Sequence, residues 1–161
     1  MANIHLIYSN SRLPLSPLIR WRTKADFSHV GLILEPNAGL ITPDSLITHS
    51  ALSSKGVKFT TLKSFIGQAS NYQITQLKEK TNYFEDVLEI AKIYEGTPYD
   101  LEGAIGLGVG ENWQDDDKFW CSEWVAFILK NIGLKLPYLD DIHRISPRHN
   151  QDWEQTVLGV V

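Results

Sequence analysis

The chain contains a single cysteine, Cys121, in the segment KFWCSEWVAFILKNIG at residues 118–133. Apolar residues recur after it at helical spacing and predict a helix that begins near Trp120 and stops at Gly133, so the thiol would lie in the first turn. Backbone N–H groups and the positive end of the helix dipole would there lower the pKa of the thiol and could hold an oxyanion. A lone cysteine forms no internal disulfide, so Cys121 is either a small buried hydrophobe or a nucleophile.

A thiol nucleophile needs a neighbouring imidazole that accepts and returns its proton. His29 lies in FSHVGLILE, residues 27–35, where alternating apolar residues predict a strand. The apolar face of this strand would carry Val30, Leu32 and Leu34. His29 would point to the other face, where it could be the base or a satisfied sheet residue.

A third polar group would have to orient that imidazole. Glu35 shares a strand face with His29, but six strand residues separate the two by about 20 Å. His49, in the strand-like segment LITHSAL, can lie beside His29 across a sheet, where opposite Cβ atoms are about 5 Å apart. The sequence therefore predicts a set of Cys121, His29 and His49, and the alternative for His49 is a half-exposed strand residue.

The same patterns predict the elements that must position these side chains. Strands are expected near residues 27–35, 45–51 and 56–61, with further strand-like segments at 3–9 and 71–78. Helices are expected at 16–24, 81–96, 120–131 and 146–157, with Thr81 and Ser146 as N-caps. The glycine-containing segment 103–113 matches no phosphate-binding motif and is expected to be a flexible loop or a loosely packed turn. Residues 1–161 would thus form one α+β domain, in which a central antiparallel sheet packs against the cysteine-bearing helix.

Composition and charge argue against several function classes. The 161 residues are 43% hydrophobic and 21% charged, and the net charge is -4. The 15 Lys and Arg residues form no basic stripe, so we expect no nucleic-acid partner. Neither a secretory signal nor a transmembrane run is recognised, and a cytoplasmic location is expected. The five histidines lack metal-binding spacing, so no metal site is expected. The aspartates at residues 115–117 are interpreted as helix-start residues.

The chain resembles the circularly permuted papain-like hydrolases of the NlpC/P60 superfamily in four segments: FSHVGLILE, LITHSAL…GVKFTTLKSF, GTPYDLEGAIG…FWCSEWVAFIL and ISPRHNQDW. The pattern is most similar to that of the YiiX-like amidases, and more distantly to that of the lecithin:retinol acyltransferase group. In this permuted branch the histidine strand precedes the cysteine helix, which is the order found here. The resemblance runs from about Phe27 to Trp153 and implies a permuted papain-like fold.

The resemblance implies that Cys121 is the nucleophile, His29 the general base and His49 the third polar residue. Many YiiX-like sequences have Glu at the third position, whereas the acyltransferase group has His. Two further motifs match the family, CSE with Ser122 and Glu123, and PYD with Tyr99 and Asp100. We expect Glu123 to be a structural partner, and the PYD motif to brace the loop before the cysteine helix.

The implied reaction is acyl transfer through a thioester on Cys121. The backbone N–H of Cys121 and a second donor would hold the oxyanion. No metal or organic cofactor is required, and the substrate would be a small peptide, a peptidoglycan fragment or an acyl compound. The prediction is a cysteine amidase or peptidase acting on an amide or (thio)ester bond. A lipid acyltransferase or phospholipase on the same fold, and a catalytically inert binding module, are the alternatives.

Overall fold

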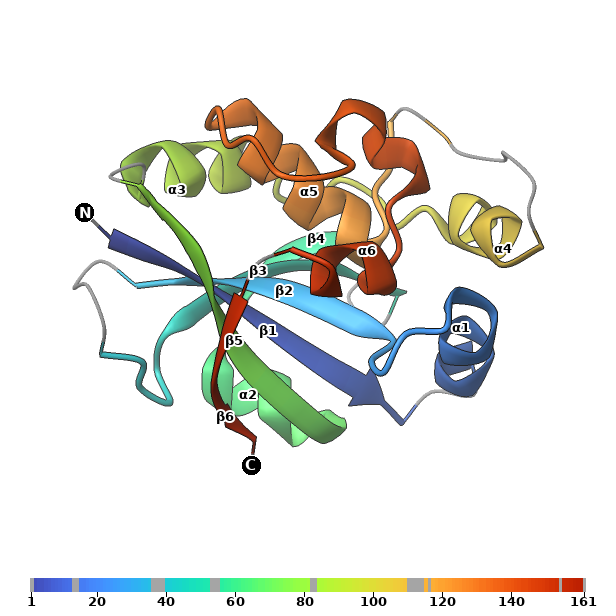
Figure 1. Cartoon of the computed structure of the whole chain (residues 1–161), viewed down its shortest axis with the longest axis horizontal. Coiled ribbons are helices and arrows are strands. Elements are labelled where there is room, and N and C mark those ends of the chain that lie inside the picture. Colours follow the sequence, from blue (N-terminus) through green and yellow to red (C-terminus); the bar gives the residue numbers. More distant parts are fainter. Residues whose placement is uncertain are drawn as a thin grey trace.

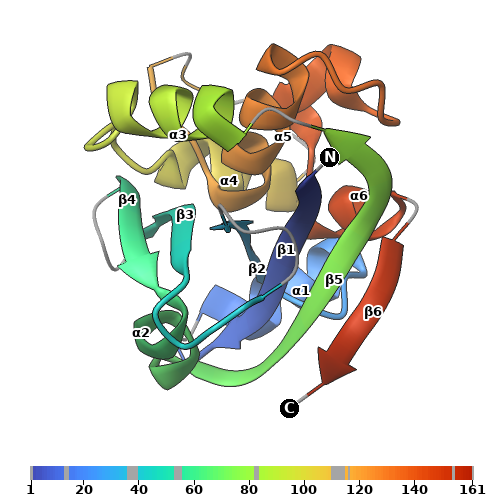
Figure 2. The same ribbon diagram turned by 90° about the vertical axis from the view of Figure 1, so that its left-hand side faces the viewer.

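The structure is a computed structural model of the chain, and it describes residues 2–12, 15–35, 40–52, 56–81, 84–109, 115, 117–153 and 155–160. Within these residues the chain forms one six-stranded sheet with helices on both faces (Figure 1). The second view shows the sheet strongly curved, with β5 arching along it and α2 on the face opposite α3 and α5 (Figure 2).

The sheet has the strand order β4-β3-β2-β1-β5-β6, and every neighbouring pair is antiparallel. Its strands are β1 (Ala2–Ser11), β2 (His29–Leu34), β3 (Leu46–Ala51), β4 (Gly56–Thr61), β5 (Ala69–Thr81) and β6 (Gln155–Val160). The five strands expected from the alternating patterns are confirmed. The sixth was not predicted, because the sequence after Ser146 was interpreted as one helix to residue 157. That helix ends at Gln151, and the β-branched segment after it pairs with β5 as an edge strand.

The helices are α1 (Leu15–Thr23), α2 (Leu62–Gly67), α3 (Phe84–Ile93), α4 (Leu101–Val109), α5 (Cys121–Asn131) and α6 (Pro147–Gln151), with a 3₁₀-helix at Leu139–Arg144. Helix α5 packs against β2 and β3, as predicted, and α3 lies beside it. The α5 helix ends where expected, because Gly133 follows it with a φ of 81°. Ser146 is the N-cap of α6, whereas Thr81 is the last residue of β5, three residues before α3 begins.

Strand alternation divides the core between the two faces of the sheet. Val30, Leu32 and Leu34 of β2 join the main core under α5, as predicted. The opposite face holds a smaller cluster of Ile7, Ile33, Ile47, Leu62 and Phe65, in which α2 supplies the last two residues. The face of β2 that carries His29 is therefore covered by a helix, although the sequence suggested a more accessible face.

The prediction of a flexible glycine loop at residues 103–113 is wrong in its first part, because Leu101–Val109 is helix α4. Gly103 is required there by packing. A Cβ at that position would lie 2.2 Å from Oδ2 of Asp100 and 2.7 Å from the ring of Trp120. Residues 110–114 lie outside the described part of the chain, as does Asp116.

Candidate active site

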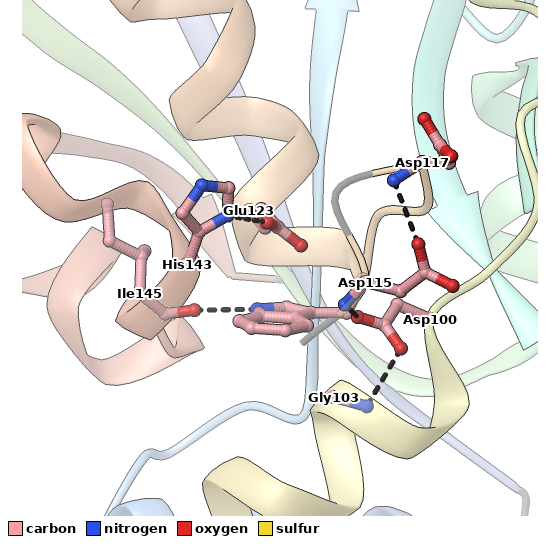
Figure 3. A network of polar contacts seen from close by, with 8 residues as sticks. Asp100, Gly103, Asp115, Asp117, Glu123, His143 and Ile145 are labelled. Carbon is pink, nitrogen blue, oxygen red and sulfur yellow. Dashed lines mark hydrogen bonds and ion pairs between the residues drawn. The ribbon is translucent and has the colours of Figure 1, made fainter. Parts of the chain in front are cut away.

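Cys121 is the first residue of α5, and contacts on both sides fix this helix start. Trp120, in extended conformation, donates from its indole N–H to the carbonyl of Ile145 at 2.7 Å. The carboxylate of Glu123, fully buried, lies 2.6 Å from Nδ1 of His143 (Figure 3). Glu123 is thus used in holding the 3₁₀-helix against α5, in agreement with the structural role expected for it.

The PYD motif braces the chain immediately before the thiol. Tyr99 and Phe119 form a parallel bridge, and the amide of Phe119 donates to the carbonyl of Pro98 at 3.1 Å. The buried carboxylate of Asp100 accepts from the amide of Gly103 at 2.8 Å and from that of Asp115 at 3.0 Å (Figure 3). Asp100 therefore ties the start of α4 to the segment that leads into Cys121, as the resemblance implied.

The thiol of Cys121 is buried, and this reverses one expectation. Its Sγ lies 3.9 Å from the carbonyl oxygen of Ser28, the residue before His29, and 4.0 Å from Oγ of Ser122. Burial raises the pKa of Cys121, and the backbone N–H groups of Val30, Ser122 and Cys121 itself lower it by less. The prediction of a lowered thiol pKa is wrong in direction, because desolvation outweighs the donors at the helix start. The thiol is accordingly neutral at neutral pH before substrate binds.

The structure brings the two histidines together. Nε2 of His29 and Nδ1 of His49 are 2.9 Å apart, and the two rings meet edge to face. The register pairs Leu32 with Thr48, which sets His49 level with Gly31, so the histidines form a diagonal pair across β2 and β3. The two histidines lie on neighbouring strands, as predicted. They are diagonal neighbours and not directly opposite, because the residue opposite His49 is Gly31.

Phe65 of α2 packs against both imidazoles. Its ring is stacked on that of His29, with centroids 5.5 Å apart, and meets that of His49 edge to face at 5.1 Å. Sequence reasoning missed this residue, because the six-residue helix that carries it is too short to show a helical period. The aromatic contact restricts the rotation of both rings and excludes water from one side of the pair.

Both histidines are held neutral. Burial, and secondarily the charge of Lys58, lowers the pKa of His29 to about 4. Burial, followed by His29 and Lys58, lowers the pKa of His49 well below its ordinary value. A neutral pair shares one hydrogen in its contact. When His29 donates this hydrogen from Nε2 to Nδ1 of His49, Nδ1 of His29 keeps a free lone pair. His49 then has its own proton on Nε2, a buried atom without a hydrogen-bond partner among the described residues.

Gly31 provides the room in which His49 lies against β2. A Cβ on Gly31 would lie 2.9 Å from Cγ2 of Ile47 and 3.3 Å from Cβ of His49. Because these neighbours are packed under α2, they have little space to move. We expect Gly31→Ala to lower the free energy of unfolding by about 1–3 kcal/mol in urea denaturation. The matched change Gly67→Ala, where no atom lies within 4 Å, should leave it unchanged; equal losses in the two variants would mean that the close approach is unimportant.

Cys121, His29 and His49 line one cavity of about 400 Å³ at the end of the sheet next to α1 and α4. Among the described residues that line it there is no Asp, Glu, Lys or Arg. Glu35 is elsewhere, where its carboxylate accepts from Oγ of Ser45 at 2.5 Å. This placement agrees with its exclusion as the third residue.

Tyr99 is a cavity residue whose possible chemistry the sequence did not reveal. Burial raises the pKa of its phenol, and the neighbouring Cys121 and Asp100 raise it further, so the hydroxyl remains a hydrogen-bond donor. The PYD motif was interpreted only as a brace for the backbone. The side chain of its tyrosine nevertheless faces the same space as the thiol.

Comparisons with known proteins agree with this architecture. A crystal structure described as that of the metalloprotein yiiX from Escherichia coli O157:H7 matches with a TM-score of 0.72 and 20% sequence identity, over 98% of this chain and 96% of that chain. At that identity the likeness shows the fold alone, and it agrees with the predicted α+β architecture. A comparison with curated protein sequences gives no match.

The description of that relative calls it a metalloprotein. Within the described ranges, no group of three or more His, Cys, Asp or Glu side chains could hold a metal ion. Among the same residues, no helix is both long and apolar enough to cross a membrane.

The family comparison covers nearly the whole chain. The model of a family described as permuted papain-like amidase enzymes, YaeF/YiiX, C92, matches residues 5–158. This match includes His29, His49 and Cys121, together with β2, β3 and α5, the elements to which they belong. The chain therefore belongs to the permuted papain-like amidases of the YaeF/YiiX, C92 family.

Proposed function

We propose that the chain is a cysteine amidase that cleaves an amide or (thio)ester bond, with Cys121 as nucleophile, His29 as general base and His49 as the residue that orients it. One observation carries the proposal. A hydrogen-bonded imidazole pair lines the same cavity as a thiol at a helix start. The sulfur of this thiol lies 3.9 Å from the carbonyl oxygen of Ser28, the residue before His29.

The mechanism begins from a neutral thiol and a neutral imidazole. Nδ1 of His29 removes the proton as Sγ of Cys121 attacks the substrate carbonyl, so the charge pair forms only during attack. The resulting imidazolium donates from Nε2 to His49, which keeps the ring oriented. His29 then protonates the leaving group, and a water molecule activated by the same ring hydrolyses the thioester.

The oxyanion that forms during attack needs two donors. The backbone N–H of Cys121 points from the helix start, and the hydroxyl of Tyr99 is the second donor in this proposal. A low-dielectric cavity strengthens both hydrogen bonds, because little water competes for the oxygen.

Tyr99→Phe should therefore lower kcat by roughly 10²-fold and leave KM nearly unchanged, since the hydroxyl acts on the transition state. Tyr94→Phe is the matched control, because this tyrosine packs on Phe119 and Phe127 and does not line the cavity. Steady-state kinetics on both variants measure the effect. A rise in KM with unchanged kcat would assign Tyr99 to ground-state binding.

His49→Ala should cost less than the loss of the base, because the third residue orients the imidazole and does not exchange the substrate's proton. We expect kcat to fall by roughly 10- to 100-fold. His49→Gln should retain more activity, since its amide oxygen can still accept from Nε2 of His29. Equal losses in the alanine and glutamine variants would contradict an orienting hydrogen bond.

A lipid acyl hydrolase or acyltransferase is the second candidate, and the cavity supports it. Charged peptides such as peptidoglycan fragments carry carboxylates, which an uncharged cavity would have to desolvate without a counter-charge. The apolar residues Leu18, Ile19, Leu101 and Ile105 line the same space and suit an acyl chain.

A substrate panel tests the proposal and separates its two forms. Muropeptides, N-acyl amides, phospholipids and acyl thioesters are compared by the kcat/KM of product release. We expect cleavage of uncharged acyl amides or esters in preference to muropeptides. No turnover on any class would favour the inert binding module, and a strong preference for muropeptides would overturn the inference drawn from the uncharged cavity.

A further inference from the structure

The mouth of the cavity is surrounded by exposed apolar side chains. Leu18 and Trp21 of α1 are 51% and 71% exposed, and Ile105 of α4 is 42% exposed. Leu52, directly after β3, is 39% exposed. All four also line the cavity that contains Cys121. We call these four residues the apolar rim.

Three of the four rim residues lie on α1 and α4, which contact each other and lie side by side at one end of the molecule (Figure 1). Trp21 differs in exposure from the other tryptophans that the structure describes, of which Trp120, Trp124 and Trp153 are at most 3% exposed. Large apolar side chains cost free energy in water, so a cluster of them around a site entrance indicates contact with an apolar phase.

The α1 side of the rim is basic in sequence although the whole chain is acidic, while α4 on the other side has the exposed Glu102. The net charge is -4, yet residues 12–26, which contain α1, have Arg12, Arg20, Arg22 and Lys24 against one acid, Asp26. Arg12 and Lys24, on either side of α1, are exposed. Basic side chains next to exposed Trp and Leu are typical of segments that lie in the interface of an anionic lipid surface.

We propose that the apolar rim docks on an anionic lipid surface, with α1 in the headgroup region and the mouth of the cavity facing the lipid. A lipid acyl group could then reach Cys121 without crossing water. This deepens the acyl-hydrolase form of the proposed function and rests on it for the fate of the acyl group, whereas the docking itself requires no catalysis. A second copy of the chain is the competing occupant, but two such rims would bring like basic charges together.

Vesicle flotation with the Cys121→Ser protein tests the docking without turnover. Vesicles of phosphatidylcholine alone are compared with equal mixtures of phosphatidylcholine and phosphatidylglycerol, at low and high salt. We expect binding to the anionic vesicles, weakened by salt because surface charges are screened. Adding Leu18→Ser and Trp21→Ser should reduce the partition coefficient by about tenfold or more. The control Ile93→Ser, at an exposed apolar residue of α3 that does not line the cavity, should leave it unchanged.

Tryptophan fluorescence gives a second readout that a folding defect cannot imitate. Lipids brominated on their acyl chains quench tryptophans that enter the bilayer. We expect quenching in the Cys121→Ser protein and its loss in the added Trp21→Phe variant, which keeps an apolar ring. Absence of vesicle binding, or binding that is equal in the rim and Ile93 variants, would overturn the docking proposal. Rim-dependent dimerisation in sedimentation without vesicle binding would also overturn it in favour of self-association. Hydrolysis of dissolved acyl substrates by the wild type, with no vesicle binding, would leave the proposed function standing and reject the docking alone.

Discussion

Cys121→Ser abolishes turnover, with kcat/KM falling by roughly 10⁴-fold or more, while the fold is retained. An alcohol is a far poorer nucleophile than a thiol at neutral pH, and a neutral His29 with a pKa of about 4 is too weak a base to activate it. The substitution changes little in volume, so the side chain can remain beside the carbonyl of Ser28, the present neighbour of the sulfur. Kinetics on the preferred acyl substrate and thermal unfolding together measure the two effects.

Retention of more than a few per cent of activity by the serine variant would mean that another group performs the attack. A large loss of stability would make the kinetic loss uninformative, so Cys121→Ala, which removes the nucleophile without adding a polar atom, serves as the second variant. Both variants should be inactive and folded.

His29→Ala lowers kcat/KM by roughly 10³-fold or more, because removal of the thiol proton and protonation of the leaving group both pass through this imidazole. Glu35→Ala, one residue beyond the end of β2, is the control and should change kcat/KM little, since its carboxylate is bonded to Ser45 away from the cavity. An equal loss in the Glu35 variant, with a harmless His49→Ala, would reject His49 as the third residue.

The pH dependence of the wild type follows from the same neutral pair. Activity needs His29 unprotonated, and its pKa of about 4 predicts that kcat/KM stays high down to about pH 5 and falls only near pH 4. The same shift affects stability. Between about pH 4 and 6.5 the unfolded state binds more protons at this histidine than the folded state does, so stability decreases as pH falls through that window. A fall of kcat/KM with a midpoint near pH 6.5 would mean that the imidazole of His29 is solvated and has an ordinary pKa.

Much of the site follows from local pattern. The helical period after Cys121 and Gly133 at its end fix where α5 lies, and strand alternation assigns Val30 and His29 to opposite faces of β2. Antiparallel neighbours then bring His49 close to His29. These inferences depend on spacing within one or two elements, which is the information that a single sequence contains.

The parts that could not be predicted depend on distant packing. The burial that raises the pKa of Cys121 comes from the whole surrounding core, so the N–H groups of the helix start gave the wrong direction. Phe65 reaches the histidines from a helix too short to show a period. Gly103 was taken as a sign of flexibility, although it is needed where α4 approaches Asp100 and Trp120.

The most direct test of the central claim is detection of the acyl-enzyme. Wild-type protein is mixed with an activated ester of its best acyl substrate, quenched in acid during turnover and analysed by intact-protein and peptide mass spectrometry. We expect an added acyl mass on Cys121 that neutral hydroxylamine removes, as is characteristic of a thioester, and that is absent from Cys121→Ala. Full turnover without any adduct, or an adduct on a different residue, would contradict covalent catalysis by Cys121.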